Sequence, residues 1–224
     1  YHHLFRDLLR QRLSQKQNKE AISQLHIRAS EWFEQSGEIG DAFQHALAAA
    51  DFDRAATLLE TNWLSMDESF QMGTWLGWAN QLPLSVRRVR PVLLTQMGWS
   101  YADAGNATAS ESILQEAEAC LKRPLKEMVI VEKGQFSTLP ARIAIAHAYN
   151  AQVEERFSDT LKFSEMAQDM APSDDAFLQA QASAILSGTY WASGELDKSF
   201  TFMSNWVDVT QQADNFAFAV VDCR

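Results

Sequence analysis

The feature that most constrains the fold is a helix–glycine–helix pattern that occurs three times. Gly37, Gly105 and Gly194 each separate two apolar segments that have the 3.6-residue period of an amphipathic helix. Glycine suits the left-handed backbone conformation that commonly ends a helix. Four positions before each glycine stands an aromatic residue, and five positions after it stands a small one: Phe33, Tyr101 and Tyr190, then Ala42, Ser110 and Ser199. The pattern predicts helical hairpins whose two helices approach closely at the small residue.

The spacing of these copies predicts a solenoid. Gly37 and Gly105 lie 68 residues apart, which is two periods of the 34-residue tetratricopeptide (TPR) repeat. A fourth copy has Glu155 at its turn, and Ser173 is the expected N-cap of the helix that follows it. All five prolines fall between periodic segments, and strand signals are nearly absent. We therefore expect an all-α fold, a TPR-like superhelix of ten or eleven helices, with an irregular connection over residues 124–139.

The charge and hydropathy of the chain argue against several classes of function. The net charge is −10 at pH 7, which disfavours binding of this segment to a nucleic-acid backbone. The one basic cluster, Arg87, Arg88 and Arg90, is more typical of a solvated connector than of a phosphate site. No apolar run approaches the roughly 20 residues of a membrane span, and the charged start is unlike a secretory signal. We therefore expect a soluble, cytoplasmic segment without membrane contact.

The sequence contains no recognisable catalytic or metal-binding motif. It has no phosphate loop, no HExxH motif and no CxxC pair, and no nucleophile stands with a general base in a familiar arrangement. His26, His45 and His147 are scattered, and none shares a helix face with another histidine. We expect no enzymatic activity, no cofactor and no metal in this segment.

A TPR superhelix has an inner groove that is lined by one stripe of each first helix. The stripe lies six, three and two residues before the turn residue and continues further back along the same face. The candidate groove residues are Trp99, Asp103, Arg142, Tyr149, Gln152 and Trp191. Aromatic faces with polar neighbours suit a small effector or an extended peptide, and an arginine suits an anionic group. The alternative is that these aromatic side chains pack between helices as core.

Several stretches of the chain resemble a known family. They are "YHHLFRDLLRQRL", "LHIRASEWFEQSGEIGDAFQHALAAADFDRAATLLE", "RPVLLTQMGWSYADAG" and "APSDDAFLQAQASAILSGTYWASGELDKSF". They closely resemble the middle of the large ATP-binding LuxR-type transcription regulators, the MalT-like family. The resemblance covers nearly the whole chain and is weakest over residues 124–139. It implies an intact protein with an NTPase that binds ATP or ADP, a winged-helix domain, a helical arm, a TPR-like sensor and a DNA-binding helix-turn-helix.

The same resemblance suggests how this chain is divided. Residues 1–16 would end the winged-helix domain, residues 17–83 would form the arm and first repeats, and residues 84–224 would form a truncated sensor superhelix. His2 takes the position of a histidine that contacts the nucleotide phosphate in related signal-transduction NTPases, while His3 stands where those proteins have an acidic residue. His2 is therefore a candidate nucleotide-sensing residue of the intact protein. The alternative is that His2 and His3 are simply polar residues at an entry turn.

Two functions remain as expectations. In the first, the segment senses an effector for an ATP-dependent regulator, and effector binding favours self-association and transcription activation. DNA would then be bound only by a separate C-terminal domain. In the second, the segment is a stand-alone TPR scaffold that binds a partner peptide and has no nucleotide or DNA function. A phosphate loop and a helix-turn-helix encoded beside this segment would distinguish the first from the second.

Overall fold

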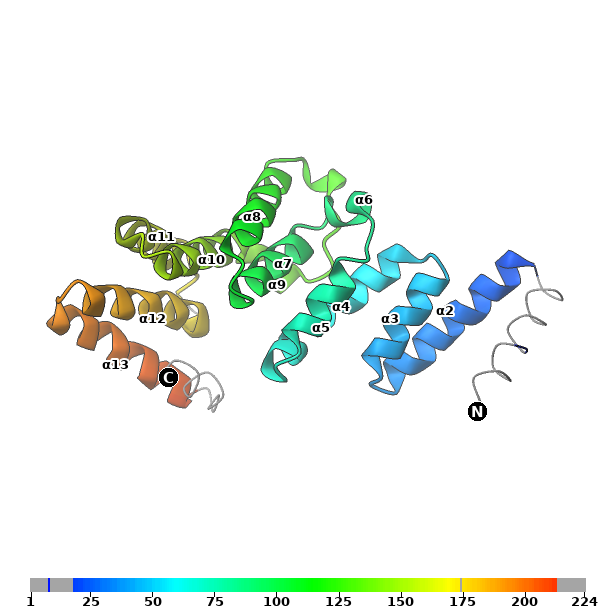
Figure 1. The fold of residues 1–224 in the computed structure, drawn as a ribbon, viewed down its shortest axis with the longest axis horizontal. Helices are drawn as coiled ribbons and strands as arrows, with labels where there is room; N and C mark the ends of the chain where they lie inside the picture. The colour runs from blue at the N-terminus through cyan, green and yellow to red at the C-terminus, as the bar shows by residue number, and fades with distance from the viewer. Residues whose placement is uncertain (1–7, 9–17, 174, 213–224) are drawn as a thin grey trace.

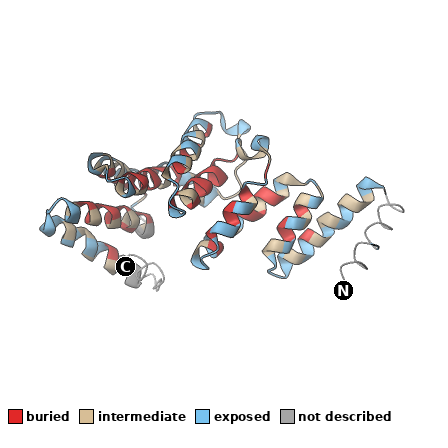
Figure 2. Cartoon of the chain, in the orientation of Figure 1, coloured by how far each residue is buried: buried red, intermediate tan, exposed pale blue. Residues whose placement is uncertain are grey.

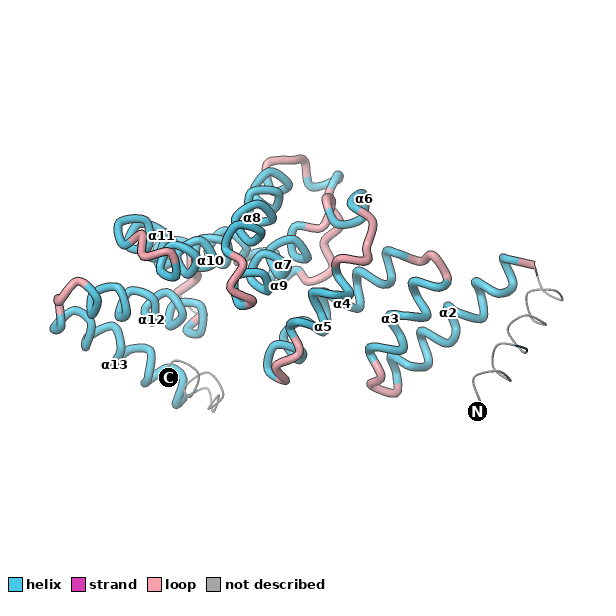
Figure 3. Tube along the Cα trace, viewed as in Figure 1, coloured by secondary structure: helices cyan, strands magenta, loops and turns pink. Residues whose placement is uncertain are grey.

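The computed structural model describes residue 8 and residues 18–173 and 175–212, and all regular structure in those residues is helical (Figures 1 and 3). The α-helices of this part are α2 (Lys19–Gln35), α3 (Ile39–Ala48), α4 (Phe52–Glu68), α5 (Met72–Ala79), α6 (Leu84–Arg87), α7 (Pro91–Asp103), α8 (Ala107–Leu121), α9 (Lys133–Ser137), α10 (Leu139–Val153), α11 (Phe157–Met170), α12 (Ala176–Ala192) and α13 (Leu196–Gln212). A 3-10 helix covers Leu125–Glu127. The described part holds more helices than the ten or eleven expected because the connections contain the short helices α6 and α9.

The helices pack as consecutive hairpins that follow one another along a curved stack (Figure 1). The most extensive packing joins α2 to α3, α7 to α8, α10 to α11 and α12 to α13. Each of these pairs is joined by one of the four turns expected from the sequence. The prediction of an all-α solenoid of helical hairpins is confirmed.

The four predicted turn residues all have a left-handed backbone. The φ angles are +79° at Gly37, +73° at Gly105, +82° at Gly194 and +57° at Glu155. In each turn the N–H of the next residue donates to the carbonyl oxygen five residues earlier, at 2.8 or 2.9 Å: Glu38 to Phe33, Asn106 to Tyr101, Arg156 to Ala151 and Glu195 to Tyr190. This is the Schellman pattern, which satisfies carbonyl groups at a helix end and reverses the chain.

Small residues let the two helices of each hairpin touch. The Ser30 hydroxyl of α2 donates to the carbonyl oxygen of Ala42 in α3 at 2.7 Å, and Ser187 of α12 donates to that of Ser199 in α13 at 2.9 Å. The two pairs occupy the same positions, seven residues before and five after the turn glycine. The prediction that small residues allow a close approach at this point of the hairpin is confirmed.

The first and second helices of a hairpin are buried differently (Figure 2). The second helices bury one stripe, which consists of Ser110, Leu114, Ala117 and Cys120 in α8 and Thr160, Ser164 and Ala167 in α11. The first helices α7 and α10 are buried on several sides, because α10 packs against α7, α8 and α12 as well as against α11. The first helices therefore form the inner layer of the stack.

Two features of the connections can be compared with the sequence. The segment between α8 and α10 is irregular as expected, and it is held by a hydrogen bond from the Val129 N–H to the Val89 carbonyl oxygen at 2.7 Å. The N-cap of helix α12 is Asp175, whose carboxylate accepts a hydrogen bond from the Leu178 N–H at 3.0 Å. The helix therefore begins two residues later than it would with Ser173 as its N-cap. The N-cap prediction was therefore wrong in position.

The hydrophobic packing is continuous across residue 84, where the resemblance suggested a boundary. Leu93 and Met97 of α7 belong to the same buried cluster as Phe43 of α3, Leu59 of α4 and Trp75 of α5. The arm and the sensor region proposed from the resemblance thus share one core at this point. Most of residues 1–16, including His2 and His3, lies outside the described residues.

Candidate functional site

A pocket lies against the first helices of three successive hairpins. Its cavity volume is about 40 Å³, and together with the open space at its mouth the hollow measures about 430 Å³. Its lining residues come from α4, α7, α9, α10 and α12: Trp63, Val92, Thr95, Gln96, Trp99, Gln135, Leu139, Arg142, Ile145 and Gln181. Apolar walls with a few polar groups are the kind of lining that small-molecule sites have.

The register of the repeats explains why these residues meet. Val92, Arg142 and Gln181 each stand thirteen residues before the turn residue of their hairpin. Thr95 and Ile145 stand ten before it. Steps of three and four residues keep side chains on one helix face, and stacking the hairpins aligns these faces. The pocket is therefore a product of the repeat itself.

Three of the groove residues expected from the sequence lie close together. Trp99 and Arg142 both line the pocket, and the Tyr149 ring lies 5.6 Å from the Trp99 ring between centroids. Trp99 and Tyr149 are half-buried and also contact buried hydrophobic residues. These two aromatic residues thus take part both in packing and in the wall of the inner face.

Arg142 is the cationic group of the pocket. Its Nε donates to the Thr138 hydroxyl at 2.9 Å, and this is the only hydrogen bond that its side chain makes to the described residues. Burial lowers the pKa of the guanidinium, while the negative charge of Asp175 opposes that shift. The guanidinium is thus half-buried and anchored at one nitrogen, and its two terminal nitrogens have no protein acceptor in the described part of the chain.

The remaining expected groove residues lie elsewhere. Gln152 is half-buried beside α12, where a Cβ placed on Gly188 would come within 2.6 Å of its Nε2. Asp103 is exposed. Burial raises the pKa of Asp67 to about 6, and the negative charge of Asp103 adds to this shift. Trp191 is 71% exposed. None of these three lines the pocket, and His2 falls outside the described residues.

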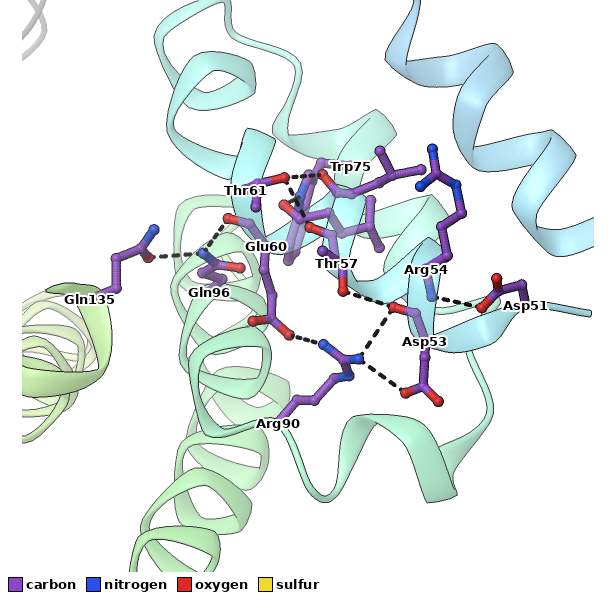
Figure 4. A network of polar contacts seen from close by, with 12 residues as sticks. Asp51, Asp53, Arg54, Thr57, Glu60, Thr61, Trp75, Arg90, Gln96 and Gln135 are labelled. Carbon is purple, nitrogen blue, oxygen red and sulfur yellow. Dashed lines mark hydrogen bonds and ion pairs between the residues drawn. The ribbon is translucent and has the colours of Figure 1, made fainter. Parts of the chain in front are cut away.

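A buried polar network adjoins the pocket (Figure 4). The Arg90 guanidinium is 2% exposed and donates from Nη1 to Glu60 Oε1 at 2.9 Å and from Nη2 to Asp53 Oδ1 at 3.0 Å. Gln96 Nε2 donates to the Glu60 carbonyl oxygen at 3.1 Å and to Gln135 Oε1 at 2.9 Å. Gln96 therefore ties the pocket wall to this ion pair.

This network corrects one expectation from the sequence. Arg90 is not part of a solvated connector, because it precedes Pro91 at the start of α7 and its side chain packs against α4. Glu60 is completely buried, and desolvation raises the pKa of its carboxyl to about 7 although Arg90 opposes the shift. The pair connects α4 to the beginning of the inner helix α7.

Several pocket residues were not predicted from the sequence. Gln135 lies in the irregular connection, which has no repeat register from which its place could be inferred. Trp63 of α4 was not among the expected groove residues, and its indole N–H donates to Ser100 Oγ at 3.3 Å. Thr95 and Gln96 stand on the inner face of α7, and counting further back from Gly105 could have found them.

The histidines do not form a metal site in the part of the chain that the structure describes. His26 Nδ1 lies 2.8 Å from His45 Nδ1, although the two come from different helices. His147 Nδ1 lies 2.8 Å from Glu111 Oε2. No group of three or more potential ligands is found in residues 18–173 and 175–212. Within the same residues, no helix has both the length and the apolarity needed to cross a membrane.

Comparison with known proteins reveals two kinds of relative. The serine/threonine-protein kinase PknK of Mycobacterium tuberculosis is 32% identical over 123 residues, which is 55% of this chain and 11% of the kinase. The HTH-type transcriptional regulator MalT of Yersinia enterocolitica is 24% identical over 98% of this chain. MalT of Yersinia pestis is 22% identical over the same share. The chain is distantly homologous to the MalT regulators.

The match to the MalT regulators runs along almost the whole chain, in agreement with the resemblance seen in the sequence. This chain spans 24% of their length. No family model matches the chain, and no solved structure matches it significantly.

Proposed function

We propose that this chain is the effector-sensing helical segment of a MalT-like, ATP-dependent transcription regulator. Effector bound on the inner face, at Trp99 and Arg142, would favour one arrangement of the hairpin stack over another. In the intact protein that preference would promote ATP-dependent self-association and transcription activation, with DNA bound by a separate domain. Such coupling needs a differential affinity of about 1–3 kcal/mol between the two states.

The observation that carries this proposal is the pocket itself. It uses one residue stripe from each of three successive first helices, so a ligand there touches α7, α10 and α12 at once. Because each repeat of a solenoid contacts mainly its neighbours, bridging three of them changes how the stack bends. The homology to the MalT regulators supplies the regulatory context.

The test uses the intact regulator that contains this segment. We expect Trp99→Leu to abolish effector-dependent self-association, measured by sedimentation velocity with ATP present, while nucleotide binding is retained. Trp32→Leu is the matched control, because Trp32 is 60% exposed on α2 and lies outside the pocket. Equal responses of the two variants to the effector would contradict the proposal.

The second candidate function is a scaffold that binds a partner peptide. Part of the chain is similar to part of a protein named as a serine/threonine kinase, so related segments occur in proteins with different activities. A reading frame that encodes no phosphate loop before this segment and no helix-turn-helix after it would favour the scaffold. The proposed His2 contact with nucleotide belongs to the regulator alone, and unchanged ADP affinity in His2→Ala would remove it.

A further inference from the structure

We propose that the pocket of α7, α10 and α12 binds a small aromatic monocarboxylate, whose carboxylate pairs with Arg142 and whose ring lies against Trp99 and Trp63. This inference rests on the proposed effector-sensing function and adds the chemical class of the ligand.

The anchor for the carboxylate is the outer edge of the Arg142 guanidinium. The Nε hydrogen bond to Thr138 at 2.9 Å fixes the orientation of the side chain. The two terminal nitrogens remain as donors, and a guanidinium offers them in the geometry that a carboxylate accepts. Burial already penalises this cation, and a bound anion would compensate the loss of hydration.

The amides beside Arg142 add donors for the same group. Gln135 Oε1 accepts from Gln96 Nε2 at 2.9 Å, which leaves the Gln135 amide nitrogen as a donor on the pocket wall. Gln181 lines the pocket from α12, and its side chain makes no hydrogen bond to the described residues. A ligand that accepts hydrogen bonds fits these neighbours.

The charge balance favours a single negative charge over a phosphate dianion. Arg142 is the only cationic residue among those that line the pocket. The negative charge of Asp175 already acts on Arg142, and the chain as a whole carries −10. A second negative charge on the ligand would find no cation and would be repelled, so a monoanion is the better match.

The rest of the pocket fits a flat apolar body. Trp63, Trp99, Leu139 and Ile145 form its apolar walls. The Trp63 indole N–H is occupied by Ser100 at 3.3 Å, so this residue presents its apolar ring surface and not a donor. Offset or edge contacts between aromatic rings add to the burial of apolar area. With a cavity of about 40 Å³ and an open mouth, the pocket limits the ligand to one ring with a short acidic side chain.

The test compares acids with their neutral amides on the 224-residue chain. The probes are benzoate, phenylacetate and 3-phenylpropionate, each paired with its primary amide, and binding is measured by isothermal titration calorimetry. We expect at least one acid to bind with a dissociation constant of about 1 mM or lower. We expect its amide, and phenyl phosphate, to bind at least 10-fold more weakly.

Two variants locate the charge. Arg142→Gln should weaken binding of the acid at least 10-fold and leave the affinity for the amide unchanged. Circular dichroism checks that the variant is folded. Arg156→Gln is the matched control, because Arg156 lies at the start of the same hairpin's second helix, outside the pocket, and pairs with Glu154 and Asp159. It should leave both affinities unchanged.

Three results would overturn the inference, and they separate it from the function on which it rests. If acid and amide bind equally well and Trp99→Leu abolishes both, the inner face binds ligands but does not recognise a carboxylate. Tighter binding of phenyl phosphate would exclude the monoanion in the same way. No binding by any probe, together with an intact regulator that ignores Trp99→Leu, would overturn both proposals.

Discussion

At the scale of single residues, the turns show how far local chemistry determines the structure. Gly37, Gly105 and Gly194 have positive φ, and Glu155 has the same conformation without being a glycine. A residue with a Cβ pays about 1–2 kcal/mol in the left-handed region. The fourth hairpin therefore forms in spite of an unfavourable turn residue, and the packing of α10 against α11 supplies the difference.

This difference predicts opposite effects of two substitutions. Gly105→Ala should lower the free energy of unfolding by about 1 kcal/mol, because alanine is strained at a φ of +73° even though nothing lies within 4 Å of the new Cβ. Glu155→Gly should raise it by up to about 1 kcal/mol, because the existing strain at a φ of +57° is removed. Urea unfolding followed by circular dichroism measures both, and a loss of stability in Glu155→Gly would contradict this account of the turn.

The buried Glu60 predicts a pH dependence of stability. Its pKa is about 7 in the folded chain against 4.5 for the free group, so between these values the folded state keeps a proton that the unfolded state has lost. Stability from this group is therefore full below pH 4.5 and decreases by about 3 kcal/mol as the pH rises to 7. Asp67, with a pKa of about 6, is still half protonated at pH 6, so it adds a smaller decrease of stability between pH 6 and 7 in the same direction.

Chemical unfolding at pH 6 and pH 7 checks this sign. The wild type should be less stable at pH 7, whereas Glu60→Gln should show a much smaller difference because its side chain cannot titrate. Asp67→Asn serves as the control and should keep most of the difference between pH 6 and 7, because Glu60 has the higher pKa. A wild type that gains stability over this interval would contradict the raised pKa.

At the scale of the elements, the hairpin of α7 and α8 depends on one glycine. A Cβ added to Gly98 would lie 2.5 Å from Leu114 Cδ2 and 2.7 Å from Leu114 Cγ, which is too close for any real contact. Leu114 is fully buried, so it has little room to move. Gly98 takes the position that Ser30 and Ser187 hold in other hairpins, seven residues before the turn glycine, and Leu114 stands nine residues after that glycine.

Gly98→Ala should therefore destabilise the chain by about 1–3 kcal/mol through overpacking. Gly77→Ala is the control: Gly77 is exposed in α5 with no atom within 4 Å of its Cβ position, and alanine there should stabilise by about 0.5–1 kcal/mol through helix propensity. Thermal unfolding compares the two. Leu114→Ala should lower the stability less in the Gly98→Ala background than in the wild type, because it removes the clashing side chain. If the losses of stability from the two substitutions simply added, the clash would be contradicted.

The elements also show how much could be predicted from the sequence. Turn residues and small contact residues act locally, so the four hairpins could be inferred from their spacing. Of the expected groove residues, Trp99, Arg142 and Tyr149 lie close together, while Asp103 and Trp191 are exposed. Gln135 and the buried pair of Arg90 and Glu60 depend on how the irregular connection folds back, and periodicity contains no information on that.

At the scale of the whole molecule, a curved stack of hairpins brings one stripe of each first helix into a shared wall (Figure 1). The central claim is that a ligand on this wall bridges α7, α10 and α12. A ligand that touches several repeats stabilises their mutual packing, and local stability of this kind is reported by amide hydrogen exchange.

Hydrogen exchange of the 224-residue chain, with and without the tightest-binding aromatic probe, tests this claim most directly. The account predicts slower exchange in α7, α10 and α12 together, with α2, α3 and the outer face of α11 unchanged. Protection confined to a single hairpin, or located in α2 and α3, would contradict it.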